Sequence, residues 1–278
     1  MKQSMTRRLA GAASGVALAA LSACGGTAED LAPGFGCGSS CADSSKLSTG
    51  QLEARFVVTG DGRSTQAEGG FFSPQAGLGF DVELKGGDQL NLVLAGATAR
   101  MALADGPGET YAAAFPSQPA AATDVQVQFV RAAGIVMSQV RLPAPFQVLA
   151  PAAGTTVAGT AADFAITLDS KPEGEFIDVV IQAFHCKDAS GADHASADTG
   201  ASSAQYFTTT DGVHYLFHPG RYPKPSFTDP QGNAVPFSTC TATLEVAASN
   251  PGTIAADYKA GSSIQAIQVR SVDFTMTY

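Results

Sequence analysis

Apolar and polar residues alternate along most of the chain after residue 50. An alternation of period two gives an extended segment one apolar face and one polar face, which is typical of a half-buried β-strand. Sequences rich in glycine and aspartate, such as Gly60-Asp61-Gly62 and Gly86-Gly87-Asp88, separate these segments and predict turns. Residues 51–142 are therefore expected to form a sandwich of antiparallel strands, with strands at 52–58, 78–84, 90–94, 125–129 and 136–142.

Two prolines, Pro143 and Pro145, mark a boundary, because proline cannot donate to a sheet and holds the backbone extended. A second strand-rich region follows over 143–278. Residues 176–186 are apolar on both faces, which predicts a central strand. Residues 206–218 predict a hairpin with a type I′ turn at Asp211-Gly212. No segment carries a helical apolar stripe, so the predicted class is all-β, with two antiparallel β-sandwich domains at 51–142 and 143–278.

The opening of the second region, residues 146–168, resembles bacterial immunoglobulin-like and fibronectin-type modules. The resemblance is carried by Phe146, Val148, Ala150-Pro151, Gly154-Thr155-Thr156-Val157, Phe164, Ile166 and Leu168. The chain has no tryptophan, and Ser238 stands two residues before Cys240 where an immunoglobulin domain has its corner tyrosine. The resemblance therefore implies the sandwich architecture and not the family.

Residues 1–23 have a basic start and an apolar run that is too short to span a bilayer, which is typical of a secretory signal. Leu21-Ser22-Ala23-Cys24 resembles the lipobox of bacterial lipoproteins, which implies cleavage before Cys24, acylation of its sulfur and attachment to membrane lipid. Gly25 follows instead of aspartate, which by resemblance implies the outer membrane, facing the periplasm or the cell surface. Residues 24–50 are rich in Gly, Ser and Ala and predict a flexible tether with a reach of roughly 28 Å.

The chain has five cysteines, an odd number for a secreted protein. If Cys24 carries lipid, four cysteines remain, and they can pair in three ways. We expect Cys37 to pair with Cys41, which is close in sequence, and Cys186 to pair with Cys240.

The formal net charge is −9, and the signal segment contributes only positive charges, so the remaining chain is more acidic still. Such a chain repels phosphate backbones, which argues against nucleic acid as a partner. Acidic chains outside the cytoplasm can hold calcium, but the same excess also favours solubility. No cofactor is expected beyond the alternatives of calcium or zinc.

All four histidines fall within 34 residues, close in sequence to several aspartates. Histidine and carboxylate together are ligands of zinc. This alternative gives the candidate metal residues His185, His194, His214, His218 and Asp193. A faint likeness to a calcium loop spans Asp188 to Asp193, but it lacks the acidic third position and the distal glutamate of that motif.

Aromatic residues gather between residues 206 and 227. Exposed rings would give a binding surface for a glycan or a protein, whereas packing inside the hairpin would explain them equally well. The candidate binding residues are Tyr206, Tyr215, Phe217 and Tyr222.

The sequence contains no Gly-x-Ser-x-Gly elbow, His-Glu-x-x-His motif, phosphate-binding loop or dinucleotide fingerprint, which argues against the enzyme classes that they mark. The sequence therefore favours a membrane-anchored, non-catalytic binding or structural module whose partner is an envelope protein or glycan. The alternative is a metal-dependent enzyme or metal carrier that uses the histidines.

Overall fold

The computed structural model describes residues 41–75, 78–105, 108–159, 163–188, 190–197, 206–221, 225–229 and 231–278. These residues belong to one compact unit. They form strands, turns and three short 3-10 helices, so the all-β prediction is confirmed. None of their helices is long and apolar enough to cross a membrane. The predicted signal and most of the tether, including Cys24 and Cys37, lie outside the described residues.

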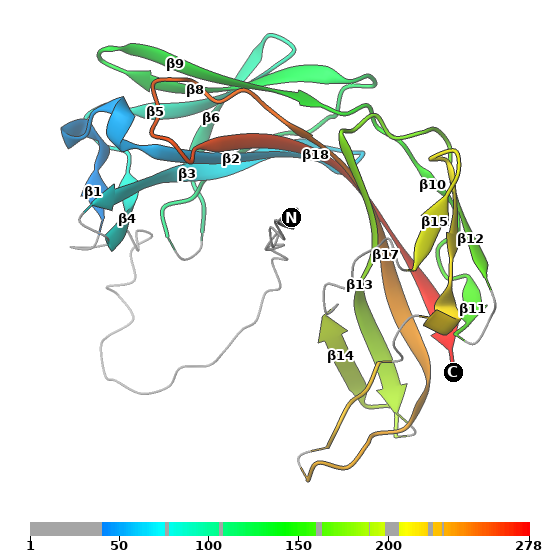
Figure 1. The fold of residues 1–278 in the computed structure, drawn as a ribbon. Helices are drawn as coiled ribbons and strands as arrows, with labels where there is room; N and C mark the ends of the chain where they lie inside the picture. The colour runs from blue at the N-terminus through cyan, green and yellow to red at the C-terminus, as the bar shows by residue number, and fades with distance from the viewer. Residues whose placement is uncertain are drawn as a thin grey trace, which may run out of the picture. The chain divides into compact units, whose positions relative to one another are not determined.

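Nine strands precede residue 143 (Figure 1). They are β1 (Ala42–Asp43), β2 (Glu53–Gly60), β3 (Thr65–Gln75), β4 (Leu78–Glu83), β5 (Gln89–Leu94), β6 (Ala97–Leu103), β7 (Tyr111–Phe115), β8 (Thr123–Arg131) and β9 (Gly134–Leu142). The alternating burial of β2, β5 and β8 is the alternation that the sequence predicts.

Nine further strands follow. They are β10 (Val148–Ala150), β11 (Thr156–Ala158), β12 (Phe164–Leu168), β13 (Phe176–Asp188), β14 (Asp193–Ala197), β15 (Phe207–Thr209), β16 (His214–Phe217), β17 (Phe237–Pro251) and β18 (Ser263–Thr277). The 3-10 helices are η2 (Ser44–Lys46), η3 (Thr49–Gln51) and η5 (Pro219–Arg221).

The strands form one long sheet and one short sheet. The long sheet runs β14-β13-β17-β18-β2-β3-β7-β6-β5-β8-β9, with β1, β4 and β11 attached beside it, and the short sheet runs β10-β12-β16-β15. Most neighbours are antiparallel, but β18 pairs in parallel with β2 and β11, and β1 pairs in parallel with β4. Strand β13 has β14 and β17 as neighbours, which confirms the prediction of a central strand.

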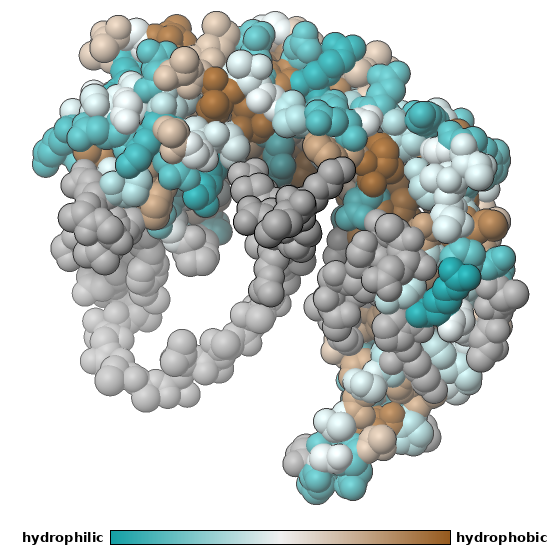
Figure 2. Space-filling view, viewed as in Figure 1, coloured by the Kyte–Doolittle hydropathy of each residue, from teal (hydrophilic) through white to brown (hydrophobic). Residues whose placement is uncertain are grey.

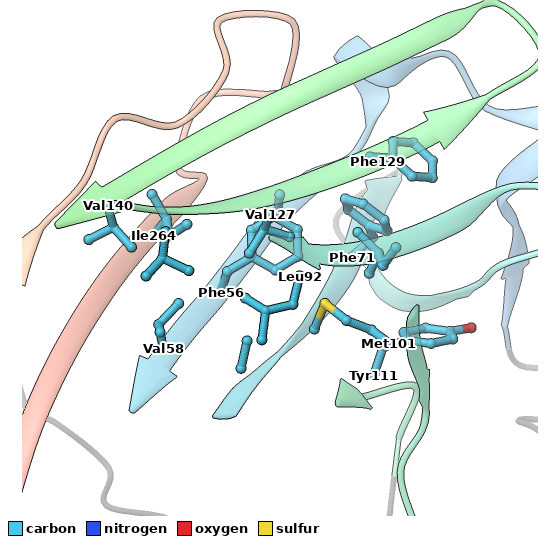
Figure 3. Close-up of a cluster of buried hydrophobic side chains, with 14 of the residues drawn as sticks. Phe56, Val58, Phe71, Leu92, Met101, Tyr111, Val127, Phe129, Val140 and Ile264 are labelled. Atoms are coloured by element: carbon cyan, nitrogen blue, oxygen red, sulfur yellow. The ribbon is translucent and has the colours of Figure 1, made fainter. Parts of the chain in front are cut away.

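The first core lies where β2 and β3 face β5, β8 and β9 (Figure 3). Phe56 of β2 points toward Leu92 and Val127 of the facing strands, and all three side chains are buried. Phe71 and Phe129 pack with ring centroids 4.6 Å apart. Full burial of each such side chain contributes about 1.5–3 kcal/mol, so this core alone stabilises one sandwich.

The second core lies between the short sheet and the β13, β17 and β18 part of the long sheet. Ile166 and Phe217 come from the short sheet, and Leu244 and Phe274 from the long sheet, and all four are buried. Two layers of strands with one core between them confirm the predicted sandwich architecture.

The predicted hairpin is confirmed as β15 and β16, but its turn type is wrong. A type I′ turn needs positive φ at both central residues, and here Gly212 has φ 74° while Asp211 is outside that region. The Asp211 carboxylate instead accepts hydrogen bonds from the backbone N–H groups of Val213 and His214, both at 2.8 Å, and so holds a wider loop.

Strand β18 contributes to both cores. Its inward face carries Ile264 and Ala266 in the first core, and Phe274 and Met276 in the second. The first core therefore includes residues that come after the predicted boundary at Pro143. The division of the chain into domains at 51–142 and 143–278 stays a prediction.

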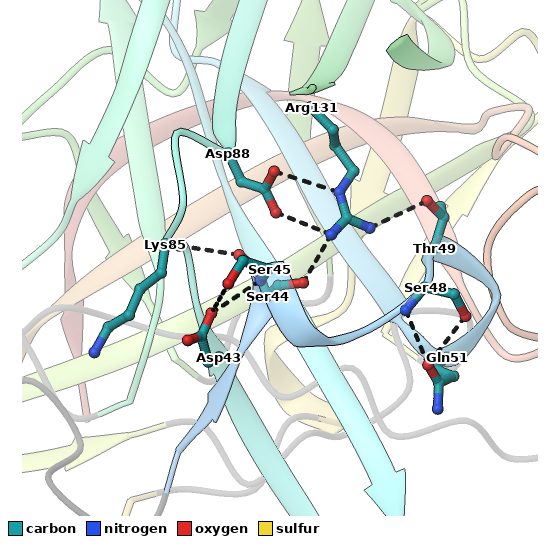
Figure 4. Close-up of polar contacts among 9 residues, drawn as sticks. All are labelled: Asp43, Ser44, Ser45, Ser48, Thr49, Gln51, Lys85, Asp88 and Arg131. Atoms are coloured by element: carbon teal, nitrogen blue, oxygen red, sulfur yellow. Dashed lines mark hydrogen bonds and ion pairs between the residues drawn. The ribbon is translucent and has the colours of Figure 1, made fainter. Parts of the chain in front are cut away.

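Residues 42–50, which their composition assigned to the tether, pack on the first sandwich (Figure 4). The Arg131 guanidinium donates to the backbone oxygen of Ser44 at 2.7 Å and lies 3.4 Å from the Thr49 hydroxyl. Its Nη2 lies 3.1 Å from Oδ2 of Asp88, and both side chains are nearly buried. We call these contacts the Arg131 clamp, and they fix the start of the folded part.

Candidate functional site

A cleft of about 820 Å³ lies where the two sandwiches meet. Five separate segments line it, so its shape depends on the fold and not on one loop. They are residues 61–63, 118–120, 145–147, Asp169 and 269–271. Ligand sites in proteins commonly have volumes of roughly 300–1,000 Å³, so the cleft is large enough for a small ligand.

The cleft exists because the inward face of β18 changes from apolar to polar between the two cores. Gln268 and Arg270 occupy the inward positions between Ala266 and Val272. Gln268 is fully buried, whereas Arg270 is partly exposed and lines the cleft. Two polar residues at this point separate the two cores and leave a space that side chains do not fill.

Arg270 is the central cation of the cleft. Its Cζ lies 5.4 Å from the centroid of the buried Phe146 ring, a cation–π distance. Its Nη1 donates to the backbone oxygen of Val269 at 2.6 Å. Among the described residues no carboxylate lies within the 4.0 Å of an ion pair with it.

Gly62 lies against the guanidinium of Arg270. Gly62 has φ +93°, and a Cβ added to it would lie 2.7 Å from Cζ of Arg270. Because Cζ is nearer to that position than either neighbouring nitrogen, glycine covers the face of the guanidinium and not its edge. Any larger residue would displace the cation.

Two aspartates line the cleft and fix its loops. Asp61 Oδ1 accepts from the backbone N–H groups of Arg63 at 2.8 Å and Ser64 at 2.7 Å. Asp169 Oδ1 accepts from the backbone N–H of Gln147 at 2.8 Å. Each carboxylate thus holds a loop through its Oδ1 atom, and its Oδ2 atom can still accept hydrogen bonds from a ligand.

Burial shapes the charges in the cleft. Burial alone would raise the pKa of Asp61, but the backbone N–H groups of Ser64 and Arg63 hold that pKa below its ordinary value. Burial lowers the pKa of Arg270, and the carboxylates of Asp61 and Asp169 partly offset this. Arg270 stays protonated at neutral pH, and the lowered pKa of Asp61 keeps that carboxylate ionised.

Gln118 lines one wall of the cleft, and the buried Gln268 lies behind it. Gln268 donates to the backbone oxygen of Gly60 at 3.0 Å, and Gln118 bonds to Gln268 through their side-chain amides. Gln118 Oε1 also accepts from the backbone N–H of Gly62 at 2.6 Å. These amides are occupied with one another, so they make the wall rigid and leave the charged groups for a ligand.

The lining residues equip the cleft to bind a polar ligand. It has two cations, Arg63 and Arg270, and two carboxylates, Asp61 and Asp169. The lining includes neither histidine nor cysteine, the side chains that most often act as base or nucleophile near neutral pH. Sequence reasoning missed this site, although the signal was present as two polar residues, Gln268 and Arg270, in the apolar face of residues 264–276.

The structure places the predicted metal residues apart. His194 pairs with Asp188 at 3.0 Å, His214 pairs with Asp211 at 2.7 Å, and His218 pairs with Asp163. His185 is exposed on β13, and Asp193 lies 3.9 Å from Lys187. Within the described ranges, no group of three or more His, Cys, Asp or Glu side chains could hold a metal ion.

The Asp188–Asp193 loop is closed by its own first residue. Asp188 Oδ1 accepts from the backbone N–H groups of Ser190 at 2.8 Å and Ala192 at 3.0 Å. The hydrogen bond from His194, followed by that from Ser190, holds the pKa of Asp188 well below its usual range. These bonds use the oxygen atoms that a calcium ion would need.

The predicted binding aromatics are mostly inside the protein. Tyr206, Tyr215 and Phe217 are 9%, 6% and 0% exposed and belong to the second core. Phe207 and Phe217 stack with centroids 4.9 Å apart. The structure thus places these rings in the core instead of on a binding surface, and Tyr222 lies outside the described residues.

Large apolar side chains on the surface are dispersed. Figure 2 shows hydrophobic and hydrophilic residues mixed over the face turned to the viewer. In the described part of the chain, the exposed ones are Leu103, Ile135, Met137, Leu149, Phe176 and Leu216. Of these, only Ile135 and Met137 share a strand, so the charged cleft is the better candidate site.

The predicted disulfide between Cys186 and Cys240 is confirmed, and it joins paired positions of β13 and β17. Cys41 is also disulfide-bonded, and Cys37 lies outside the described residues. The predicted pairing of Cys37 with Cys41 stays a prediction.

No family model and no curated protein matches the chain. Several solved structures of immunoglobulin-like and fibronectin-like modules align with it. The titin domains Z1Z2 in complex with telethonin are 11% identical over 82% of this chain and 96% of theirs, with a TM-score of 0.20. The Clostridium thermocellum CbhA fibronectin(III)-like modules are 9% identical over 78% of this chain and 89% of theirs, with a TM-score of 0.18. These scores are too low to bear on what this chain binds.

Proposed function

We propose that this protein is a membrane-anchored, non-catalytic binding module of the bacterial envelope that holds an envelope glycan or protein segment in the cleft between its sandwiches. The observation that carries the proposal is the partly buried Arg270, which lines a cleft of about 820 Å³ without a carboxylate in ion-pair contact among the described residues. A charge that burial has partly stripped of water gains from a bound anion or polar group.

The cleft favours binding over catalysis. Its carboxylates already hold loops, the Gln118 amide is bonded to Gln268, and its one side-chain hydroxyl is Ser271. A general base would have to lie within hydrogen-bond reach of a nucleophile, and the lining supplies no histidine for that role.

The sequence supports the anchor. The lipobox at residues 21–24 would place acyl chains on Cys24, and more than one chain makes attachment durable. The Arg131 clamp fixes residues 44–49, so about twenty residues remain between the anchor and the first fixed point. At about 5–6 Å times the square root of that number, the cleft would stay within a few tens of ångströms of an outer-membrane surface.

The test uses a tryptophan as a reporter, because the natural chain contains none. Ala120 is exposed on the rim of the cleft, so Ala120→Trp introduces one fluorophore there. Titration of the full chain in detergent with soluble fragments of cell-wall peptidoglycan and envelope polysaccharide should give a saturable change in emission. The bound fragments should be recovered with unchanged mass.

The matched control is Ala133→Trp, at an exposed turn between β8 and β9 outside the cleft. It should give no change with the same fragments. Equal responses from the two reporters, or no response at Ala120→Trp, would refute binding in the cleft, and a change in ligand mass would favour an enzyme.

A further inference from the structure

The Nε and Nη2 atoms of Arg270 determine which anion the guanidinium can bind. The Nη1 atom donates a hydrogen bond to the backbone oxygen of Val269, whereas Nε and Nη2 have no acceptor among the described residues. Gly62 lies over the face of the guanidinium near these two nitrogens, and Arg270 lines the cleft. Parallel N–H groups on Nε and Nη2 match the two oxygens of one carboxylate in a bidentate pair.

The carboxylates beside Arg270 determine what else the ligand carries. Asp169 uses Oδ1 for Gln147 and Ser170, and the structure gives its Oδ2 no partner among the described residues. The Oδ2 atom of Asp61 accepts only from the Ser64 hydroxyl, at 3.2 Å. These oxygens can accept hydrogen bonds, so they favour a ligand that bears hydroxyl groups close to its carboxylate.

The overall charge limits the ligand to few negative charges. The chain has a formal net charge of −9, and the cleft balances two cations with two carboxylates. A polyanion would be repelled by this arrangement, whereas a single carboxylate on a neutral, hydroxyl-rich body would not.

We infer that the cleft recognises an acidic sugar residue, of the uronic acid kind, whose carboxylate pairs with the Nε and Nη2 edge of Arg270 and whose hydroxyl groups donate to Asp61 and Asp169. This inference rests on the proposed function and names the ligand class for the same site. The volume of about 820 Å³ accommodates one or two sugar rings.

The test compares defined ligands on the unmodified full chain in detergent, with saturation-transfer NMR detecting the ligand protons. The probes are D-glucuronate, its neutral methyl ester, the carboxylate dipeptide acetyl-alanyl-alanine and inorganic phosphate as a competitor. D-glucuronate should bind, and the methyl ester should bind at least about tenfold more weakly because it loses a charge-assisted, bidentate contact.

Variants then locate the contact. Arg270→Gln should weaken glucuronate binding by about tenfold or more. Arg270→Lys should weaken it as well, because lysine keeps the charge but cannot donate two parallel hydrogen bonds to one carboxylate. Arg141→Gln is the matched control, because Arg141 is exposed, pairs with Asp124 and lies outside the cleft. Its binding should equal that of the wild type.

Several results would overturn the inference. Equal binding of glucuronate and its methyl ester would show that the cleft does not recognise the carboxylate. This comparison needs no variant of the protein. Equal or tighter binding of the dipeptide, or displacement of glucuronate by phosphate at lower concentration, would contradict an acidic sugar. If neutral envelope fragments bind the Ala120→Trp reporter while glucuronate does not, this inference fails and the proposed function stands. If no fragment binds, both fail.

Discussion

Two arginines illustrate how one side chain takes opposite roles. The Arg131 side chain is 12% exposed, lies 5.1 Å from the Phe129 ring centroid and has Asp88 beside it. Arg270 also lies over a ring but has no carboxylate in ion-pair contact among the described residues. The first is committed to the fold, and the second is available to a ligand. The sequence marks both simply as arginines at strand positions, so it could not assign these roles.

Loss of the Arg131 clamp should be costly. Arg131→Ala leaves Asp88 buried without its cation and frees residues 44–49, so the free energy of unfolding should fall by about 3–5 kcal/mol. Chemical denaturation followed by circular dichroism measures this change.

The matched control is Arg141→Ala. Its pair with Asp124 is exposed on both sides, at 59% and 69%, and such pairs contribute about 0–1 kcal/mol. Similar losses for the two variants would contradict the importance of the Arg131 clamp.

At the scale of elements, alternation in the sequence predicted the strands well. It indicated β2, β5, β8 and β9 because each has one face in a core. It could not predict partners, because the parallel pairing of β18 with β2 joins segments about 200 residues apart. The sequence could therefore mark Gln268 and Arg270 as polar, but it could not show which other segments would surround them in the cleft.

The predicted histidine site shows the same difference. Closeness in sequence suggested a cluster, but His194 lies on β14 of the long sheet and His214 on β16 of the short sheet. These two histidines each pair with an aspartate close by in sequence, His194 with Asp188 and His214 with Asp211. Spacing along a chain that folds into two layers does not fix which side chains meet.

The disulfide between β13 and β17 should stabilise the second sandwich. Its cysteines are 54 residues apart, and in the chain-entropy model such a link contributes about 4 kcal/mol. Replacing both Cys186 and Cys240 with alanine should therefore lower the free energy of unfolding by about 2–4 kcal/mol, as measured by urea denaturation.

The first core serves as the internal reference for this variant. Signals from Tyr258, which belongs to the first core, and from Tyr215, which belongs to the second, can be followed separately by NMR. If the variant unfolds at the same urea concentration as the wild type, the stabilising role is refuted.

At the scale of the whole molecule, the proposed function gives the anchor and the folded body separate roles. The described residues form one compact unit that lacks a membrane-spanning helix. In the proposed function, the acyl chains expected on Cys24 attach the protein to the membrane, and the cleft binds the ligand.

Removal of the lipidation site should separate these roles. Cys24→Ser should move the protein from the membrane pellet to the soluble fraction, because the acyl chains are the expected contact with lipid. Fractionation with immunoblotting measures this, and the unchanged emission response of Ala120→Trp in the same background is the control. Sedimentation of the Cys24→Ser protein with the membrane would contradict the lipid anchor.

The sharing of β18 has a consequence for the order in which the molecule can mature. Strand β2, which begins at Glu53, can pair with its parallel neighbour only once Ser263–Gln268 is present. Strand β17 pairs with the opposite edge of the same strand, β18. Neither half can therefore complete its sheet before Ser263–Thr277 is available. An intermediate of export that lacks this segment would leave one edge of β2 and one edge of β17 without a neighbour, so both halves would be incomplete at once.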